Sequence, residues 1–135
     1  MQAIIPKGRK IRVFIIMNHE KRRFLEKVSY VTSPGFGDGR DWRERMGLKG
    51  GGPSAVVTTK GVMRFDPVTR EMLLQSIHPG ITIENIVENT GWNLRLAPEI
   101  EETIPPSHSE LKIIRKHDPS GFWTRRNGGS HERIA

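Results

Sequence analysis

The amino-acid sequence predicts an α/β domain whose strands run in mixed directions. Three observations support this class. The run VFIIM at residues 13–17 is apolar at every position, which is typical of a strand covered on both faces inside a parallel sheet. Residues 54–77 hold three short strand-like segments separated by turn residues. Two later segments, at residues 82–91 and 107–114, open on helix-capping residues and carry apolar side chains at helical spacing.

The composition is that of one globular domain. With 135 residues, 35% hydrophobic and 27% charged, the chain is long enough for one core and too polar for a membrane protein. No apolar run approaches the roughly 18–20 residues of a spanning helix, and the first ten residues show no secretory signal. The lack of cysteine excludes disulfides, thiolate metal sites and a cysteine nucleophile. We therefore expect a cytoplasmic protein without membrane association.

The first part of the chain is expected to form two strands and a long connection. The buried strand covers residues 11–17, and polar residues 18–23 follow it, at the sheet edge where open α/β folds place their ligands. Residues 27–32, KVSYVT, have the β-branched composition of a second strand. Residues 33–53 are rich in glycine and proline and form a long loop, with a short helix at residues 42–46. Loops of this length are commonly functional or covered by a partner.

The middle of the chain predicts an antiparallel hairpin and a further strand. Strands are expected at residues 54–59 and 61–65. Residues 66–69, DPVT, carry the aspartate and proline of a tight turn, and residues 71–77 return as the partner strand. The alternating residues 93–97 form the last strand. The hairpin is what makes the strand directions mixed.

Capping residues define two helices. Thr82 is placed to cap a helix that stops at Gly91. Ser107 and Glu110 have the spacing of a capping box at the start of the last helix. Little periodicity remains beyond that helix, so residues 118–135 are expected to form a loosely ordered basic tail.

The net charge of +7 is concentrated at the two ends of the chain. Residues 1–27 hold eight lysines and arginines against two glutamates, and residues 115–135 hold five against two acidic residues. Such segments bind nucleic acid, phosphorylated molecules or acidic partners, or form a solvated face. No RRM, KH, zinc-finger or helix-turn-helix pattern accompanies the charge, and the three tryptophans are scattered. A basic binding module for RNA or a protein is therefore kept as an alternative function, and nucleic acid is not the favoured partner.

Patterns for phosphate loops and metal sites are absent from the sequence. The glycine-rich residues 35–39 and 50–53 lack both the Walker and the dinucleotide-binding arrangement, which favours ordinary turns. The five histidines show no paired metal-ligand spacing, so no metal site is expected. His19, at a strand end, is the one histidine in a plausible site position. Glu20 is followed by three cations at residues 21–23, which favours a structural ion pair over a catalytic carboxylate.

Three segments carry a resemblance to a known family. They are VFIIMNHEKRRFLEKVSYVTSPG at residues 13–35, GLKGGGPSAVVTTKGVMRFD at 47–66 and LLQSIHPGITIENIVENTGWNL at 73–94. Taken in this order, they resemble the β subunit of the family I coenzyme A transferases of the glutaconate and 3-oxoadipate type. The resemblance covers about residues 10–115. It implies that residues 1–117 form the C-terminal half of such a subunit, with the coenzyme A transferase fold of a mixed, mostly parallel sheet and flanking helices.

The resemblance also implies which parts of the family's chemistry to look for. Family members attack an acyl-CoA with a glutamate and hold the oxyanion with a glycine-rich loop, and both lie upstream of the segment that corresponds to residues 13–17. Before Lys10 the sequence has no glutamate and a single glycine, so we assign no catalytic residue. Two-step acyl transfer needs the nucleophile and the oxyanion donors. The chain alone is therefore expected to be inactive.

The same resemblance implies ligands, partners and site residues. The expected reaction transfers CoA between an acyl-CoA and a free carboxylic acid, dicarboxylic or 3-oxo, with coenzyme A as substrate and no permanently bound cofactor. The expected protein partners are a separate N-terminal β half and an α-type subunit. The positions expected to border the acyl-CoA cleft are His19, Glu20, Arg22, Ser33, Pro34 and Gly35.

Overall fold

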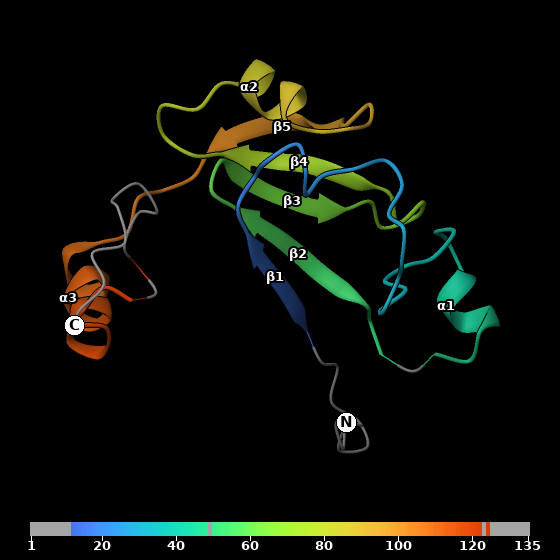
Figure 1. The fold of residues 1–135 in the computed structure, drawn as a ribbon, viewed down its shortest axis with the longest axis horizontal. Helices are drawn as coiled ribbons and strands as arrows, with labels where there is room; N and C mark the ends of the chain where they lie inside the picture. Colours follow the sequence, from blue (N-terminus) through green and yellow to red (C-terminus); the bar gives the residue numbers. More distant parts are fainter. Residues whose placement is uncertain (1–11, 49, 123, 125–135) are drawn as a thin grey trace. The chain divides into compact units, whose positions relative to one another are not determined.

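A computed structural model describes residues 12–48, 50–122 and 124 (Figure 1). The chain divides into two compact units, Met1–Thr103 and Ile104–Ala135. The described part of the first unit contains the sheet and two helices, and that of the second contains one helix. Most of the tail predicted at residues 118–135 lies outside the described residues, so its looseness stays a prediction.

The first unit is built on one five-stranded sheet whose spatial order follows the chain (Figure 1). The two outer pairs, β1–β2 and β4–β5, are parallel, and the two central pairs are antiparallel. This arrangement confirms the predicted α/β class with a mixed sheet. The strands are β1 (Val13–Met17), β2 (Pro53–Thr58), β3 (Gly61–Phe65), β4 (Met72–Ile77) and β5 (Arg95–Glu102).

The β3–β4 hairpin forms at the predicted turn because one aspartate closes it. The Asp66 carboxylate accepts hydrogen bonds from the backbone N–H groups of Val68, at 2.8 Å, and Thr69, at 2.7 Å. Arg70 then takes a left-handed conformation with φ of 63°, which turns the chain into β4. Local turn chemistry therefore fixes the hairpin that the sequence predicts.

Three helices lie in the described residues, and two of them have the predicted caps. The Thr82 hydroxyl accepts a hydrogen bond from the Asn85 backbone N–H at 3.2 Å. Both bonds of the capping box between Ser107 and Glu110 are present. The helix that Thr82 caps ends before Gly91, the residue at which the sequence predicts that it stops. The helices are α1 (Trp42–Arg45), α2 (Ile83–Glu88) and α3 (His108–His117).

The strand predicted at residues 27–32 is wrong. The segment has no strand pairing, and the side chains of Val28, Tyr30 and Val31 are 57%, 79% and 59% exposed. A β-branched composition stabilises a strand only where a neighbouring strand and a packed face are available. Here β1 pairs directly with β2, so residues 27–32 find neither.

The hydrophobic core lies where α2 packs on the sheet. Met63 on β3, Leu74 on β4 and Ile86 on α2 are fully buried. An added Cβ on Gly61 would lie 3.4 Å from Ile86 Cδ1, which shows how closely the helix approaches β3. The buried apolar cluster consists of Phe24, Val56, Met63, Leu74, Ile86 and Leu94.

Strand β1 is not covered on both faces by the described residues, although an apolar run of this kind is typical of a strand that is covered. Val13, Phe14, Ile15 and Ile16 are 46%, 53%, 40% and 82% exposed. The reason is its position, because β1 is the edge of the sheet and the core lies over the inner strands.

Among the described residues, none of the helices has the length and apolar character that a span across a bilayer requires.

Candidate functional site

The carboxyl end of β1 carries a buried histidine in a hydrogen-bonded cluster. His19 is 2% exposed, and its ring lies 4.2 Å from the Phe24 ring at an interplanar angle of 6°. Nδ1 lies 3.2 Å from the Thr58 hydroxyl at the end of β2, and Nε2 lies 3.1 Å from the Thr90 hydroxyl after α2. The ring therefore ties three segments together and has no nitrogen free for a ligand.

The hydroxyl partners restrict the protonation state of His19. Thr58 is placed to donate to the Gly61 carbonyl at 2.9 Å, and Thr90 to the Ile86 carbonyl at 2.8 Å. Each hydroxyl has a single hydrogen, so a neutral ring requires one of them to turn from its carbonyl to the ring. Burial, and secondarily the charge of Lys60, lowers the pKa of His19 from 6.5 to about 4. The ring is therefore neutral at pH 7.

This histidine predicts a fold that loses stability in acid. The unfolded chain takes up a proton below pH 6.5, whereas folded His19 resists protonation down to about pH 4. Stability from His19 is therefore full above pH 6.5 and falls as the pH drops from 6.5 to 4, by about 1–3 kcal/mol. Urea unfolding at pH 7, 6, 5 and 4 measures the loss. The His19→Gln variant cannot titrate, so its stability gap to the parent should narrow in acid, and parallel curves would contradict the assignment.

Glu20 and Arg22 lie at the surface beside this cluster. The Glu20 carboxylate accepts a hydrogen bond from Arg22 Nε and lies 3.5 Å from Arg23 Nε. The Arg22 hydrogen bond, more than any other contact, lowers the pKa of Glu20. The structural ion pair that the sequence favours for Glu20 is thus present. The Glu20 carboxylate is ionised and paired with Arg22 and Arg23.

Ser33, Pro34 and Gly35 lie at the other end of β1, beside a cavity of about 400 Å³. Its position follows from the register, because Val13 lines the cavity and pairs with Pro53 at the start of β2. The remaining walls are mostly apolar or glycine. They are formed by Ile15, Leu48, Gly50, Gly51 and Gly52, together with Arg43.

Arg43 is the charged residue among those that line this cavity. Its Nη1 donates to the Gly35 carbonyl, and its Nε is buried without a hydrogen-bond partner. No carboxylate of residues 12–48, 50–122 and 124 lies within ion-pair distance of it. A guanidinium held beside an apolar cavity without a counter-ion favours an anionic ligand.

Sequence reasoning missed Arg43 because it lies in the short helix α1 among other charged residues. An arginine in the run WRER is by default a solvated helix residue, as Arg45 is, with its ion pair to Asp41. Arg43 is distinguished from Arg45 by its contact with Gly52, where an added Cβ would lie 3.3 Å from Arg43 Cδ and 2.8 Å from the Phe36 ring. That contact is not visible without the fold.

The structure therefore does not bring the six expected cleft residues together. His19, Glu20 and Arg22 follow the carboxyl end of β1, whereas Ser33, Pro34 and Gly35 lie at its amino end. A five-residue strand separates the two groups by roughly 16 Å. Of the two groups, the second lines a cavity with a cation, and it is the better candidate for a ligand site.

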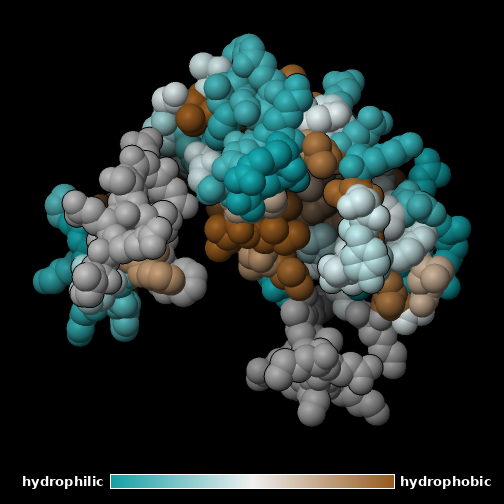
Figure 2. All heavy atoms as spheres, viewed as in Figure 1, coloured by the Kyte–Doolittle hydropathy of each residue, from teal (hydrophilic) through white to brown (hydrophobic). Residues whose placement is uncertain are grey.

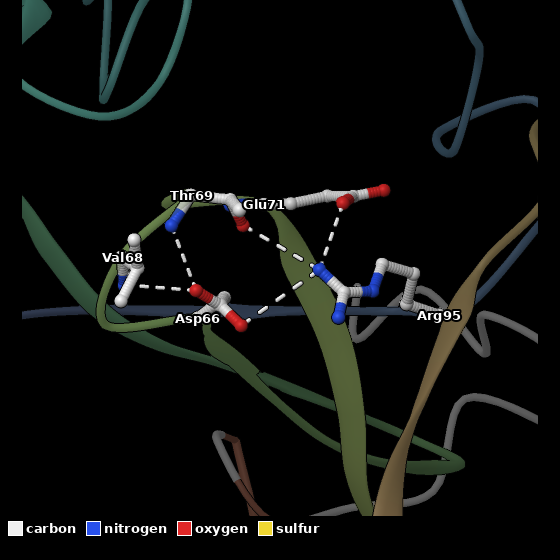
Figure 3. Close-up of polar contacts among 5 residues, drawn as sticks. All are labelled: Asp66, Val68, Thr69, Glu71 and Arg95. Carbon is white, nitrogen blue, oxygen red and sulfur yellow. Dashed lines mark hydrogen bonds and ion pairs between the residues drawn. The ribbon is translucent and has the colours of Figure 1, made fainter.

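A second cluster of charges holds the hairpin to β5 (Figure 3). Arg95 Nη1 lies 3.0 Å from the Glu71 carboxylate and 3.7 Å from that of Asp66. The pKa of Asp66 is lowered, chiefly by the backbone hydrogen bond from Thr69. Both carboxylates are paired with one arginine, which is a structural arrangement rather than an acid–base pair. No group of three metal-ligating side chains occurs in the described part of the chain.

Comparison with known proteins places these features in a family. Residues 4–89 match the coenzyme A transferase family. The chain is 46% identical over 107 residues to the B, or β, subunit of glutaconate CoA-transferase from Acidaminococcus fermentans, covering 78% of this chain and 40% of that protein. It is 39% identical over 108 residues to the corresponding B subunit of 3-oxoadipate CoA-transferase from Pseudomonas knackmussii, covering 80% and 42%.

A solved structure agrees with these matches. The crystal structure of glutaconate coenzyme A-transferase from Acidaminococcus fermentans superposes with a TM-score of 0.74 at 43% identity, covering 84% of this chain and 44% of that chain. The chain thus spans about two fifths of the length of the curated relatives that it matches.

Proposed function

The chain belongs to the coenzyme A transferase family, and we propose that it forms part of the β subunit of an enzyme that transfers CoA between an acyl-CoA and a free carboxylic acid. The observation that carries this proposal is the 46% identity to the β subunit of glutaconate CoA-transferase over 107 residues. A cytoplasmic location goes with it, supported by the lack of cysteine.

The proposed enzyme is an assembly of several polypeptides. We assign to it a polypeptide that corresponds to the remaining part of the β subunit, together with an α-type subunit. Support comes from the names of the relatives, which are β subunits, and from the two fifths of their length that the chain spans. Because no nucleophilic glutamate is assigned in this chain, the chain alone is inactive in this proposal.

Within this proposal the cavity beside Ser33–Gly35 binds part of the substrate. Glutaconate and 3-oxoadipate, which the relatives' names give, are dicarboxylates. Arg43 has no carboxylate partner among the described residues and lines a cavity with mostly apolar or glycine walls. A carboxylate of the acid substrate is the anion that we assign to it. The exposed Glu20–Arg22 pair lies at the far end of β1 and does not line this cavity, so we assign no substrate group to it.

Reconstitution tests the function. The full chain is co-expressed with the α subunit of the Acidaminococcus fermentans transferase and with the part of its β subunit that lies outside the matched region. CoA transfer from an acyl-CoA to glutaconate is followed by chromatography of the thioesters. We expect transfer by the assembly and none by the chain alone. Turnover by the chain alone, or a stable assembly without turnover, would contradict the proposal.

Arg43 provides a sharper prediction in the same assembly. Replacing Arg43 by glutamine removes the cation and keeps a polar side chain, so KM for the dicarboxylate should rise at least about tenfold with a smaller change in kcat. Arg45→Gln is the matched control, because Arg45 lies on the same helix but is exposed and paired with Asp41. Equal KM values for the two variants would remove Arg43 from the substrate site.

A further inference from the structure

A second cavity of about 400 Å³ lies beside the one that Arg43 lines, on the other face of β1. Successive side chains of a strand point to opposite faces, so Val13 and Ile15 line the Arg43 cavity and Phe14 lines the second one. We call the second cavity the arginine pocket. The side chains that define it are Arg12, Phe14, Phe36, Arg64, Phe65 and Arg70.

The three arginines of this pocket have no counter-ion in the described part of the chain. Neither an aspartate nor a glutamate lines the pocket, and the ion pairs among the described residues do not include Arg12, Arg64 or Arg70. The carboxylates of the nearby hairpin, on Asp66 and Glu71, are paired with Arg95 instead (Figure 3). The pocket therefore concentrates positive charge that an anionic ligand would neutralise.

Two of the arginines are oriented by contacts within the inner part of the sheet. Arg64 Nη1 donates to the Ser54 carbonyl at 3.3 Å. The Arg70 guanidinium lies 5.6 Å from the centroid of the Phe36 ring, which meets the Phe65 ring edge-on at 4.9 Å. Because these contacts orient the guanidinium groups in advance, less side-chain entropy is lost when they bind an anion.

The pocket also has aromatic surface. Phe14 lines it and is 53% exposed, and Figure 2 shows hydrophobic surface where β1 lies in Figure 1. An exposed phenylalanine ring offers a face on which a nucleobase can stack, and guanidinium groups match the geometry of phosphate oxygens. A volume of about 400 Å³ is within the usual range for small-ligand sites. A nucleotide combines the two chemical groups that these side chains recognise.

We propose that the arginine pocket binds a nucleotide, with Arg64 and Arg70 on its phosphate groups and Phe14 against its base. The site differs from the Arg43 cavity, which has one cation and mostly apolar or glycine walls. It does not depend on the proposed function, because it rests on the charges and rings of the pocket alone. The phosphates come either from a free nucleotide or from the nucleotide end of coenzyme A, which carries the same chemistry.

Calorimetric titration of the full chain with ADP tests the charge part of the proposal. We expect binding at low salt that weakens as the salt concentration rises. Arg64→Gln and Arg70→Gln should each raise Kd at least about tenfold, because each removes a charge-assisted hydrogen bond to phosphate. Arg45→Gln is the matched control, since it removes the same charge from a residue that does not line the pocket. It should leave Kd within about twofold of the parent value.

Thermal unfolding shows whether the variants are folded. Arg64 and Arg70 are exposed and have no ion pair among the described residues, so both glutamine variants should melt within a few degrees of the parent. A change in Kd without a change in Tm then belongs to the pocket. Saturating ADP should raise the Tm of the parent and of Arg45→Gln, and should do so less for the two pocket variants.

Phe14→Leu tests the base. Leucine keeps an apolar side chain and removes the ring, so Kd for ADP should rise about fivefold or more while Kd for pyrophosphate stays unchanged. An equal effect on both ligands, or equal affinity of the parent for both, would overturn the assignment of a nucleotide.

The remaining outcomes decide the site and the source of its ligand. No ADP binding at low salt, or equal Kd values for Arg45→Gln and Arg64→Gln, would overturn the arginine pocket. Displacement of ADP by coenzyme A would support the pocket with coenzyme A as the source, and ADP binding that coenzyme A leaves intact would support it with a free nucleotide. ADP binding by a chain that fails to support CoA transfer in the reconstituted assembly would contradict the proposed function alone.

Discussion

Replacing Leu74 by alanine is expected to lower the free energy of unfolding by about 2–5 kcal/mol. Leu74 is fully buried on β4, pairs with Met63 on β3 and belongs to the cluster that contains Ile86 of α2. The truncation loses buried apolar area and leaves a cavity that the surrounding strands and helix cannot fill. Urea unfolding followed by circular dichroism gives the value.

Leu96→Ala is the matched control for this substitution. Leu96 lies opposite Leu74 on the neighbouring strand β5, but it is 46% exposed. Its truncation should cost less than about 1 kcal/mol. Similar losses of unfolding free energy for both variants would mean that the core is not centred where α2 meets the inner strands. They would also mean that the rest of the chain buries Leu74 less than the fold indicates.

The parts of the fold that the sequence predicts are those with local causes. The β3–β4 hairpin follows from the Asp66 turn, and α3 follows from the capping box of Ser107 and Glu110. In each case the hydrogen bonds join residues two or three positions apart, so the pattern is readable without the fold. The α/β class is predictable for the same reason.

The parts that the sequence misses depend on distant partners. Residues 27–32 have the composition of a strand, yet no strand edge is offered to them. The sequence does not show that β1 lies at the edge of the described sheet, where Val13 to Ile16 are at least 40% exposed. Arg43 becomes a site candidate only when Gly35 and Gly52 are brought to it. Secondary-structure propensity does not predict these contacts, because they join residues that are not neighbours in the sequence.

Residues 73–94, one of the three segments that carry the family resemblance, have a physical explanation in the structure. His78 Nε2 lies 2.9 Å from the Thr58 carbonyl and donates to it, and Nδ1 lies 2.7 Å from the Thr103 hydroxyl. Thr82 caps α2, and Thr90 meets His19. These polar residues join the end of β2 to the end of β5 and to the segment after β1. They hold the strand ends around His19, at the opposite end of β1 from the cavity that Arg43 lines.

Gly91 completes this set, and Gly91→Val is expected to destabilise the chain by about 3–4 kcal/mol. The Gly91 backbone N–H donates to the Phe24 carbonyl at 2.7 Å, and an added Cβ would lie 2.6 Å from that same oxygen and 3.2 Å from Leu25 Cα. Backbone cannot yield as a flexible side chain can, so the valine must break the hydrogen bond and push the segment after β1 away from α2.

Gly51→Val is the matched control for Gly91→Val, because no atom lies within 4 Å of its added Cβ and its φ is not in the left-handed region. It should change stability by less than about 0.5 kcal/mol. The displacement in the Gly91 variant has a second signature, since Phe24 stacks on His19. Loosening that stack exposes the ring, so the His19 pKa should rise toward 6.5 in the folded variant, measurable by NMR titration. A valine variant with unchanged stability and an unchanged His19 pKa would show that the close approach of α2 to this segment does not hold the histidine in place.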